Sequence, residues 1–149
     1  MKIIRTNYLN PKFQELVRHL NEDLAQRDGK DHPLAQFNEI SNLNYVVLVL
    51  FDNKPVGCGA ISNYNQTAME VKRMYVTPSY RGQKIGECIL SELENWTQEL
   101  GFNKCILFMG VNQPEAMRLY TRNHFSVIKN YGKLKDISDS ICLAKNLSF

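Results

Sequence analysis

The residues best suited to chemistry lie in a glycine-bearing, arginine-led loop at positions 81–86, Arg-Gly-Gln-Lys-Ile-Gly. The loop joins a strand expected over residues 69–76 to a helix expected over residues 85–100. Such a connection directs several unpaired main-chain N–H groups at one point, and the helix dipole adds partial positive charge there. Gly82 and Gly86 have no Cβ, so a bulky anion could approach the backbone closely. The pattern therefore predicts a cradle for a pyrophosphate.

Length, composition and charge exclude several classes of protein. The chain has 149 residues, of which 44% are hydrophobic and 22% charged, as is typical of one globular domain over residues 1–149. Lysine and arginine number 18 against 15 aspartate and glutamate residues, and this small excess does not predict a nucleic-acid partner. The longest uninterrupted apolar run, residues 45–51, is far too short for a membrane span.

Cysteine and histidine usage indicates a cytoplasmic protein without a metal site. The cysteines at positions 58, 88, 105 and 142 are widely spaced among mostly apolar neighbours, which predicts free thiols in a reducing cytoplasm. The N-terminus has no apolar segment of the kind found in secretion signals. The histidines at positions 19, 32 and 124 have no metal-ligand spacing with one another or with a cysteine, so no metal is expected.

The hydrophobic pattern predicts alternating strands and helices. A short strand at residues 3–4 precedes a helix that has Asn10 as its cap and Pro11 in its first turn, and that ends at Asp28-Gly29. The polar stretch that follows is expected to be a loop with room for a short helix. Further strands are expected over 45–51, 56–63, 69–76, 104–109, 125–128 and 141–144, and further helices over 85–100 and from 112 onward. This order predicts one α/β sandwich with a mixed sheet.

Two segments resemble the motifs of a known family. The run Met74-Tyr75-Val76-x-Pro78-x-Tyr80-Arg81-Gly82-Gln83-Lys84-Ile85-Gly86 resembles motif A of the GNAT superfamily of acetyl-CoA-dependent N-acetyltransferases. The run Ala116-Met117-Arg118-Leu119-Tyr120, with Phe125 five residues later, resembles motif B, and the element order is similar over nearly the whole chain. The resemblance implies an α/β fold with a mixed, mostly antiparallel sheet of six to seven strands and helices on both faces.

The resemblance also implies which residues bind the co-substrate, coenzyme A. Its pyrophosphate would be held by the main-chain N–H groups of Arg81, Gly82, Gln83, Lys84, Ile85 and Gly86. Its pantetheine arm would lie along the main chain of Met74, Tyr75 and Val76. Tyr120 matches the tyrosine that gives a proton to the departing thiolate, and a phenol with a pKa of about 10 can protonate a thiolate whose conjugate acid has a pKa of about 8.5. The alternative for Tyr120 is a core aromatic residue, and the alternative for Arg81-Gly82 is a plain surface turn.

Three positions depart from the family pattern. Lys84 replaces a usual glycine: with helical φ it still offers its N–H and adds a cation, whereas a positive φ would strain it by about 1–2 kcal/mol. The asparagine usual three residues before the motif B alanine is Gln113 here, with Asn112 beside it, so both are candidates for contact with coenzyme A. His124 stands where glycine is usual.

Glu70 is the candidate general base. It lies six residues before Val76, where some relatives place the glutamate that deprotonates the acceptor amine. By strand alternation it shares a face with Lys72, Met74 and Val76, although a bulge would break that alternation. The alternatives are a solvated Glu70–Lys72 pair and proton removal through ordered water.

Residues 23–32 lie where relatives vary their acceptor specificity. Arg27 could bind an acidic group of the acceptor, and Asp28 or Asp31 its ammonium group, with His32 in the same segment and Phe37 as a further pocket residue. A solvated loop is the alternative.

Together these features predict a cytoplasmic N-acetyltransferase that uses acetyl-CoA and no metal. The acceptor, a primary amine, would attack the thioester directly, and a main-chain N–H near residues 74–76 would stabilise the oxyanion. A small-molecule acceptor is favoured over a protein amine, and a homodimer is compatible with the sequence. The rivals are a non-catalytic module that binds or senses acyl-CoA and a basic nucleic-acid-binding domain. A route through an acyl-cysteine is disfavoured because neither Cys58 nor Cys88 has a neighbouring base.

Overall fold

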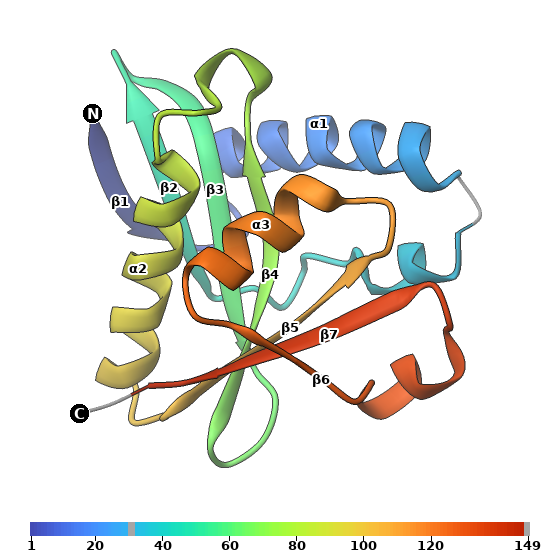
Figure 1. Ribbon diagram of the computed structural model, residues 1–149. Helices are drawn as coiled ribbons and strands as arrows, with labels where there is room; N and C mark the ends of the chain where they lie inside the picture. The colour runs from blue at the N-terminus through green and yellow to red at the C-terminus, as the bar shows by residue number, and fades with distance from the viewer. Residues whose placement is uncertain (30–31, 148–149) are drawn as a thin grey trace.

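The structure is a computed structural model that describes residues 1–29 and 32–147. Its strands are β1 (Lys2–Thr6), β2 (Tyr45–Phe51), β3 (Lys54–Asn63), β4 (Ala68–Val76), β5 (Lys104–Gly110), β6 (Ser126–Ile128) and β7 (Ser140–Asn146). Its α-helices are α1 (Pro11–Asp28), α2 (Ile85–Glu99) and α3 (Pro114–Arg122), and its 3-10 helices are η1 (Pro33–Phe37), η2 (Pro78–Tyr80) and η3 (Gly132–Asp136). Figure 1 shows their arrangement.

The seven strands form one mixed sheet in the order β1-β2-β3-β4-β5-β7-β6. Neighbouring strands are antiparallel except for β4 and β5, which are parallel. The predicted α/β fold, with a mostly antiparallel sheet of six to seven strands, is therefore confirmed. The predicted strands and helices are all present, with ends that differ by a few residues. Of the three 3-10 helices, η1 lies in the loop where a short helix was expected, whereas η2 and η3 were not predicted.

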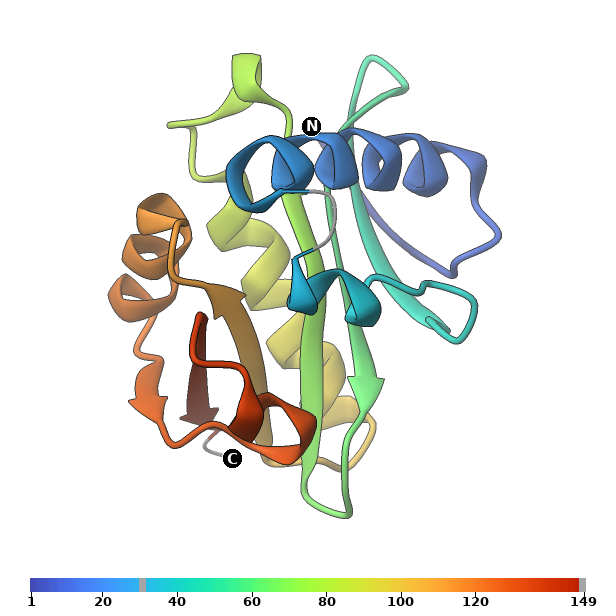
Figure 2. The ribbon, with the colours of Figure 1, turned by 90° about the vertical axis from the view of Figure 1, so that its right-hand side faces the viewer.

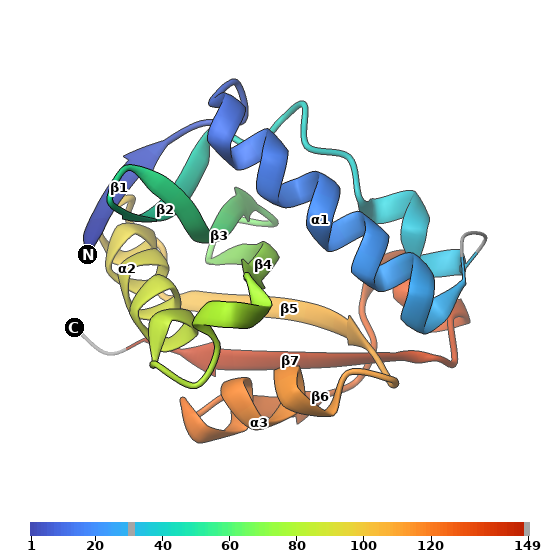
Figure 3. The same cartoon turned by 90° about the horizontal axis from the view of Figure 1, so that it is seen from above.

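Helices cover both faces of the sheet, as the view in Figure 3 shows. Val46 and Leu48 of β2 pack with Phe13 and Leu16 of α1, whereas Val47 and Val49 lie in the core cluster that contains α2 and Tyr120 of α3. This alternation along β2 gives each face its own apolar core. No helix in the described part of the chain combines the length and apolarity needed to cross a bilayer.

The central parallel pair separates before it reaches the end of the sheet. The β4–β5 ladder pairs only Ala68–Glu70 with Lys104–Ile106. Beyond these residues β4 continues to Val76 and β5 to Gly110, and Figures 1 and 2 show the two strands diverging. The divergence leaves an edge of β4 without a strand partner in the middle of the molecule.

Local signals explain where the helices begin and end. The Asn10 side chain accepts a hydrogen bond from the Lys12 N–H at 2.9 Å, so the predicted cap of α1 is confirmed. Gly29, with φ of 88°, follows the last turn of that helix. Both ends of α1 are therefore fixed by the sequence that flanks it.

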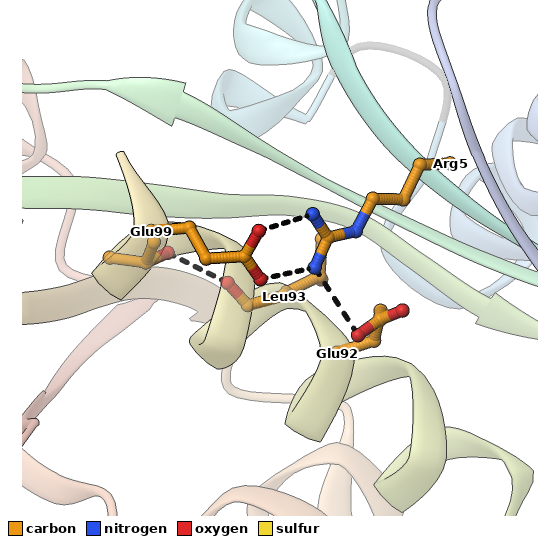
Figure 4. Close-up of polar contacts among 5 residues, drawn as sticks. Arg5, Glu92, Leu93 and Glu99 are labelled. Atoms are coloured by element: carbon orange, nitrogen blue, oxygen red, sulfur yellow. Dashed lines mark hydrogen bonds and ion pairs between the residues drawn. The ribbon is translucent and has the colours of Figure 1, made fainter. Parts of the chain in front are cut away.

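A polar cluster joins β1 to α2 on the surface (Figure 4). The Arg5 guanidinium donates to both carboxylate oxygens of Glu99, at 2.8 and 2.6 Å, and lies 3.5 Å from Glu92. It also lies 4.6 Å from the centre of the Trp96 ring. The hydrogen bonds from Arg5 lower the pKa of the Glu99 carboxyl. The cluster fixes the edge strand against the helix that carries the loop at residues 81–86.

Candidate active site

The diverging strands β4 and β5 border a cleft of about 960 Å³. Residues from the second half of α1, from η1, from the start of α2 and from α3 complete its walls. Most of the predicted site residues line this cleft: Arg27, Asp28, His32, Phe37, Met74, Tyr75, Val76, Arg81, Gly82, Lys84, Ile85, Gly86, Gln113 and Tyr120. Gln83, Asn112 and Glu70 are not among its lining residues.

The loop before α2 contains main-chain donors that no protein group binds within the described chain. Gly82 has φ of 81° and Lys84 has φ of 64° and ψ of 22°, so both are left-handed. The first hydrogen bond of the helix runs from the Cys88 N–H to the Lys84 carbonyl oxygen at 3.1 Å. Within the described chain, no protein acceptor binds the N–H groups of residues 82–86. The Arg81 N–H differs from the prediction, because it donates to the Pro78 carbonyl oxygen at 3.3 Å.

The two glycines of this loop have different structural roles. A Cβ on Gly82 would have no atom within 4 Å, so the left-handed backbone is what requires glycine there. A Cβ on Gly86 would lie 3.4 Å from a Leu119 methyl group, so this glycine faces α3. That distance is an ordinary van der Waals contact.

The Arg81 side chain is exposed and lies across the end of β4. Its Nε donates to the Val76 carbonyl oxygen at 2.8 Å, and its guanidinium lies 5.6 Å from the centre of the Tyr75 ring. This arrangement places a cation beside the free main-chain donors of the loop.

A bulge in β4 changes which side chains share a face. The β3–β4 register shifts between Cys58 and Ala60, and Arg73 has a left-handed φ of 55°. As a result, Val71 and Met74 pack in the same core cluster, although alternation would place them on opposite faces. The predicted sharing of one face by Glu70 and Met74 is therefore wrong.

Glu70 lies in a smaller cavity of about 150 Å³ that adjoins the cleft at Phe37 and Phe108. One carboxylate oxygen accepts a hydrogen bond from the Tyr131 hydroxyl at 2.5 Å, and the other lies 3.8 Å from the Lys72 ammonium group. Burial, with the adjacent Glu70 charge, raises the pKa of Tyr131 and keeps it a neutral donor. The glutamate side chain is only 13% exposed, so its pair with Lys72 is largely shielded from solvent.

Tyr120 has a hydroxyl without a hydrogen-bond partner among the described residues. The residue is 7% exposed, lines the cleft and packs edge-on against Phe125 at 5.6 Å between ring centres. Burial raises the pKa of the Tyr120 hydroxyl, so the phenol stays protonated at neutral pH. It can donate a proton into the cleft.

The end of α1 places charged groups beside β5 and α3. Arg27 forms ion pairs with Asp23 and with Glu115, so two carboxylates of the protein already surround the guanidinium predicted to bind the acceptor. Asp28 accepts a weak hydrogen bond of 3.4 Å from Asn112 and lies close to Gly110.

The two remaining predicted acceptor residues lie at η1. His32 caps this 3-10 helix through its Nδ1 atom, which accepts from the Leu34 N–H at 3.1 Å. Phe37 packs edge-on against Phe108 at 5.3 Å between ring centres. The predicted ammonium ligand Asp31 lies outside the described residues.

Sequence reasoning missed Arg73. Its side chain is 8% exposed, and its guanidinium donates to the side-chain oxygens of Asn21 and Asn38, each at 2.5 Å. All three residues line the cleft. The available signal was that Arg73 directly follows Lys72, so that two charged residues in a row break the alternation of polar and apolar residues in β4.

No set of three or more histidine, cysteine, aspartate or glutamate side chains is arranged to hold a metal ion within residues 1–29 and 32–147.

Comparison with known proteins identifies the family. Residues 12–125 match the model of the acetyltransferase (GNAT) family. The chain is 38% identical over 122 residues to the IAA acetyltransferase of Azospirillum brasilense, covering 76% of this chain and 79% of that protein. The chain therefore belongs to the GNAT acetyltransferase family and is an acyltransferase.

Solved structures share the fold over nearly the full chain. A Klebsiella pneumoniae protein proposed to be an acyl-CoA N-acyltransferase matches with a TM-score of 0.84 and 25% identity, covering 99% of this chain and 97% of that one. An N-acetyltransferase from Thermoplasma acidophilum in complex with coenzyme A matches with a TM-score of 0.73 and 18% identity, covering 98% and 99%.

Proposed function

We propose that the protein transfers an acetyl group from acetyl-CoA to a primary amine, by direct attack and without a covalent enzyme intermediate. The observation that carries this proposal is that the N–H groups of residues 82–86 have no protein acceptor in the described chain, and that four of these residues line the cleft between β4 and β5: Gly82, Lys84, Ile85 and Gly86. On the α3 side of the same cleft, the Tyr120 hydroxyl has no partner within the described chain. The proposed anion site and the proposed proton donor thus line the same cleft.

The residues of the cleft fit coenzyme A. The donors of residues 82–86, with the cations of Arg81 and Lys84, would bind the pyrophosphate. The main chain of residues 74–76, on the edge of β4 that has no strand partner, would bind the pantetheine amides as an additional strand does. Gln113 lines the cleft at the start of α3 and would contact the same molecule, whereas Asn112 instead donates to Asp28.

Tyr120 would complete the transfer. A bond forms between the amine nitrogen and the thioester carbonyl carbon, the carbon–sulfur bond breaks, and the Tyr120 hydroxyl gives its proton to the departing sulfur. Burial makes this phenol a weaker acid, which works against the transfer, but it also disfavours a bare thiolate in the same cleft, which works in its favour. The two effects offset each other in part.

The surplus proton of the amine would leave through water. The Glu70 carboxylate is held by Tyr131 and Lys72 in the adjoining cavity. It would therefore receive that proton only through water molecules that connect the two cavities where they meet, at Phe37 and Phe108. A small-molecule acceptor is favoured because residues of α1 and η1 line the cleft beside the strands, and the acceptor has to fit among them.

Titration of free thiol in a mixture of the protein, acetyl-CoA and a panel of amines tests this proposal. Acceptor-dependent release of coenzyme A supports the transferase. The rival, a module that senses acyl-CoA, would bind the coenzyme tightly in calorimetry but release no thiol with any amine. Including lysine peptides in the panel separates a protein acceptor from a small one.

A further inference from the structure

We infer that the acceptor carries a carboxylate or a similar planar anion, and that Arg73 binds it. This inference rests on the proposed function, since it specifies the class of amine that the cleft accepts. It names a residue at the bulge of β4 rather than one in either sequence motif.

Arg73 is a buried cation without a protein counter-ion in the described chain. Its two contacts, to Asn21 and Asn38, are to neutral amide oxygens, and none of the described carboxylates forms an ion pair with it. Its Nε–H is buried and has no hydrogen-bond partner. Burial lowers the pKa of the guanidinium to about 10, which leaves it charged at neutral pH.

A buried charge of this kind is costly unless an opposite charge lies nearby. The protein does not reduce the cost by exposing the side chain, because only 8% of Arg73 is accessible. Arg73, Asn21 and Asn38 all line the cleft, so the missing negative charge has a place to bind. The planar guanidinium matches a carboxylate in geometry, and the two asparagines hold it in position.

Arg27, the arginine predicted from sequence to bind an acidic acceptor, has a different environment. It is paired with Asp23 and Glu115, so its charge is already compensated within the protein. A ligand carboxylate would compete with two protein carboxylates at Arg27 but with none of the described ones at Arg73. A preference for an acidic acceptor would therefore come from Arg73 rather than from Arg27.

Matched pairs of amines that differ only in the carboxylate test this inference. Suitable pairs are L-phenylalanine with phenethylamine, L-methionine with 3-(methylthio)propylamine and L-lysine with cadaverine, each assayed by release of thiol from acetyl-CoA. For the wild type, kcat/KM should favour the carboxylated member of an accepted pair by roughly 10- to 100-fold, the range for a hydrogen bond to a charged group. The difference should lie mainly in KM, since the contact orients the acceptor and takes no part in proton transfer.

Variants at position 73 assign the preference to this residue. Arg73→Met should bring the ratio within each pair close to 1 while the rates with the amines that lack the carboxylate persist, and Arg73→Lys should retain part of the ratio. Arg18→Met is the matched control, because Arg18 is an exposed arginine of α1 outside the cleft, and it should leave both the ratio and the rates unchanged.

A binding measurement keeps this inference separate from the transferase activity. In the presence of coenzyme A, N-acetyl-L-phenylalanine should raise the unfolding temperature of the wild type more than N-acetylphenethylamine does, and Arg73→Met should remove that difference. If N-acetyl-L-phenylalanine stabilises the protein in an Arg73-dependent way but no amine releases thiol, the anion site at Arg73 is supported and the transferase proposal is refuted. Equal rates within every accepted pair, or equal stabilisation by the two acetylated compounds, would overturn the role of Arg73 even if thiol release is rapid.

Discussion

Replacing Lys84 with glycine should stabilise this protein, whereas replacing it with alanine should not. Lys84 is the residue before α2, and its φ of 64° and ψ of 22° are left-handed. It makes no side-chain hydrogen bond at the cap of the helix. Lys84→Ala removes the charge but keeps the Cβ that opposes this conformation, and Lys84→Gly removes both. The difference between the two variants therefore isolates backbone strain.

The magnitude follows from the conformation. A left-handed residue with a Cβ costs about 1–2 kcal/mol. Glycine also makes the unfolded chain more flexible, which offsets about 0.4–1 kcal/mol of the gain. The glycine variant should thus exceed the alanine variant by about 0.5–1 kcal/mol in free energy of unfolding. For a chain of 149 residues, that corresponds to roughly 2–3 °C in unfolding temperature.

Thermal unfolding of both variants by circular dichroism measures this difference. Gly82 supplies a control in the opposite direction. Its φ is 81°, and an added Cβ would meet no atom within 4 Å. Gly82→Ala should therefore lower the unfolding temperature by a similar amount, through backbone strain alone. If the two Lys84 variants unfold at the same temperature, Lys84 is not strained and the loop has another conformation in solution.

Three further predictions concern the site and its support. Tyr120→Phe should lower kcat roughly 100-fold and leave the KM for acetyl-CoA unchanged, and a wild-type kcat would remove the proton-donor role. Arg81→Ala should raise the KM for acetyl-CoA roughly 5- to 10-fold with little change in kcat, and an unchanged KM would contradict its place at the pyrophosphate. The hydrogen bonds from Arg5 lower the pKa of Glu99, so their stabilisation is present above the ordinary value of 4.5 and is lost as pH falls through the lower folded value. The difference in unfolding temperature between wild type and Arg5→Met should therefore shrink between neutral pH and about pH 3, whereas a constant difference would show that Glu99 carries no pH-dependent stability.

Short-range signals in the sequence were sufficient for most of the fold and for the conformation of the loop that we propose binds the pyrophosphate. Asn10 and Pro11 fix the start of α1 because a cap acts on the next few residues. The apolar stripe of α2 and the loop at residues 81–86 are likewise local patterns, and they place free N–H groups at a helix start wherever that helix packs. The sequence left two conformations open at Lys84, and the structure has the left-handed one.

The acceptor side of the cleft depended on contacts between distant segments. Arg73 lies at a bulge of β4, a strand that contains no glycine, and the bulge reverses the faces that alternation assigns in β4. Glu70 meets Tyr131 across 61 positions of sequence, and Arg27 meets Glu115 of α3. Caps, stripes and turns follow from neighbouring residues, so the sequence alone determined them. The bulge, the divergence of β4 from β5 and the pairing of charges depend on how whole elements pack, and only the tertiary structure decided them.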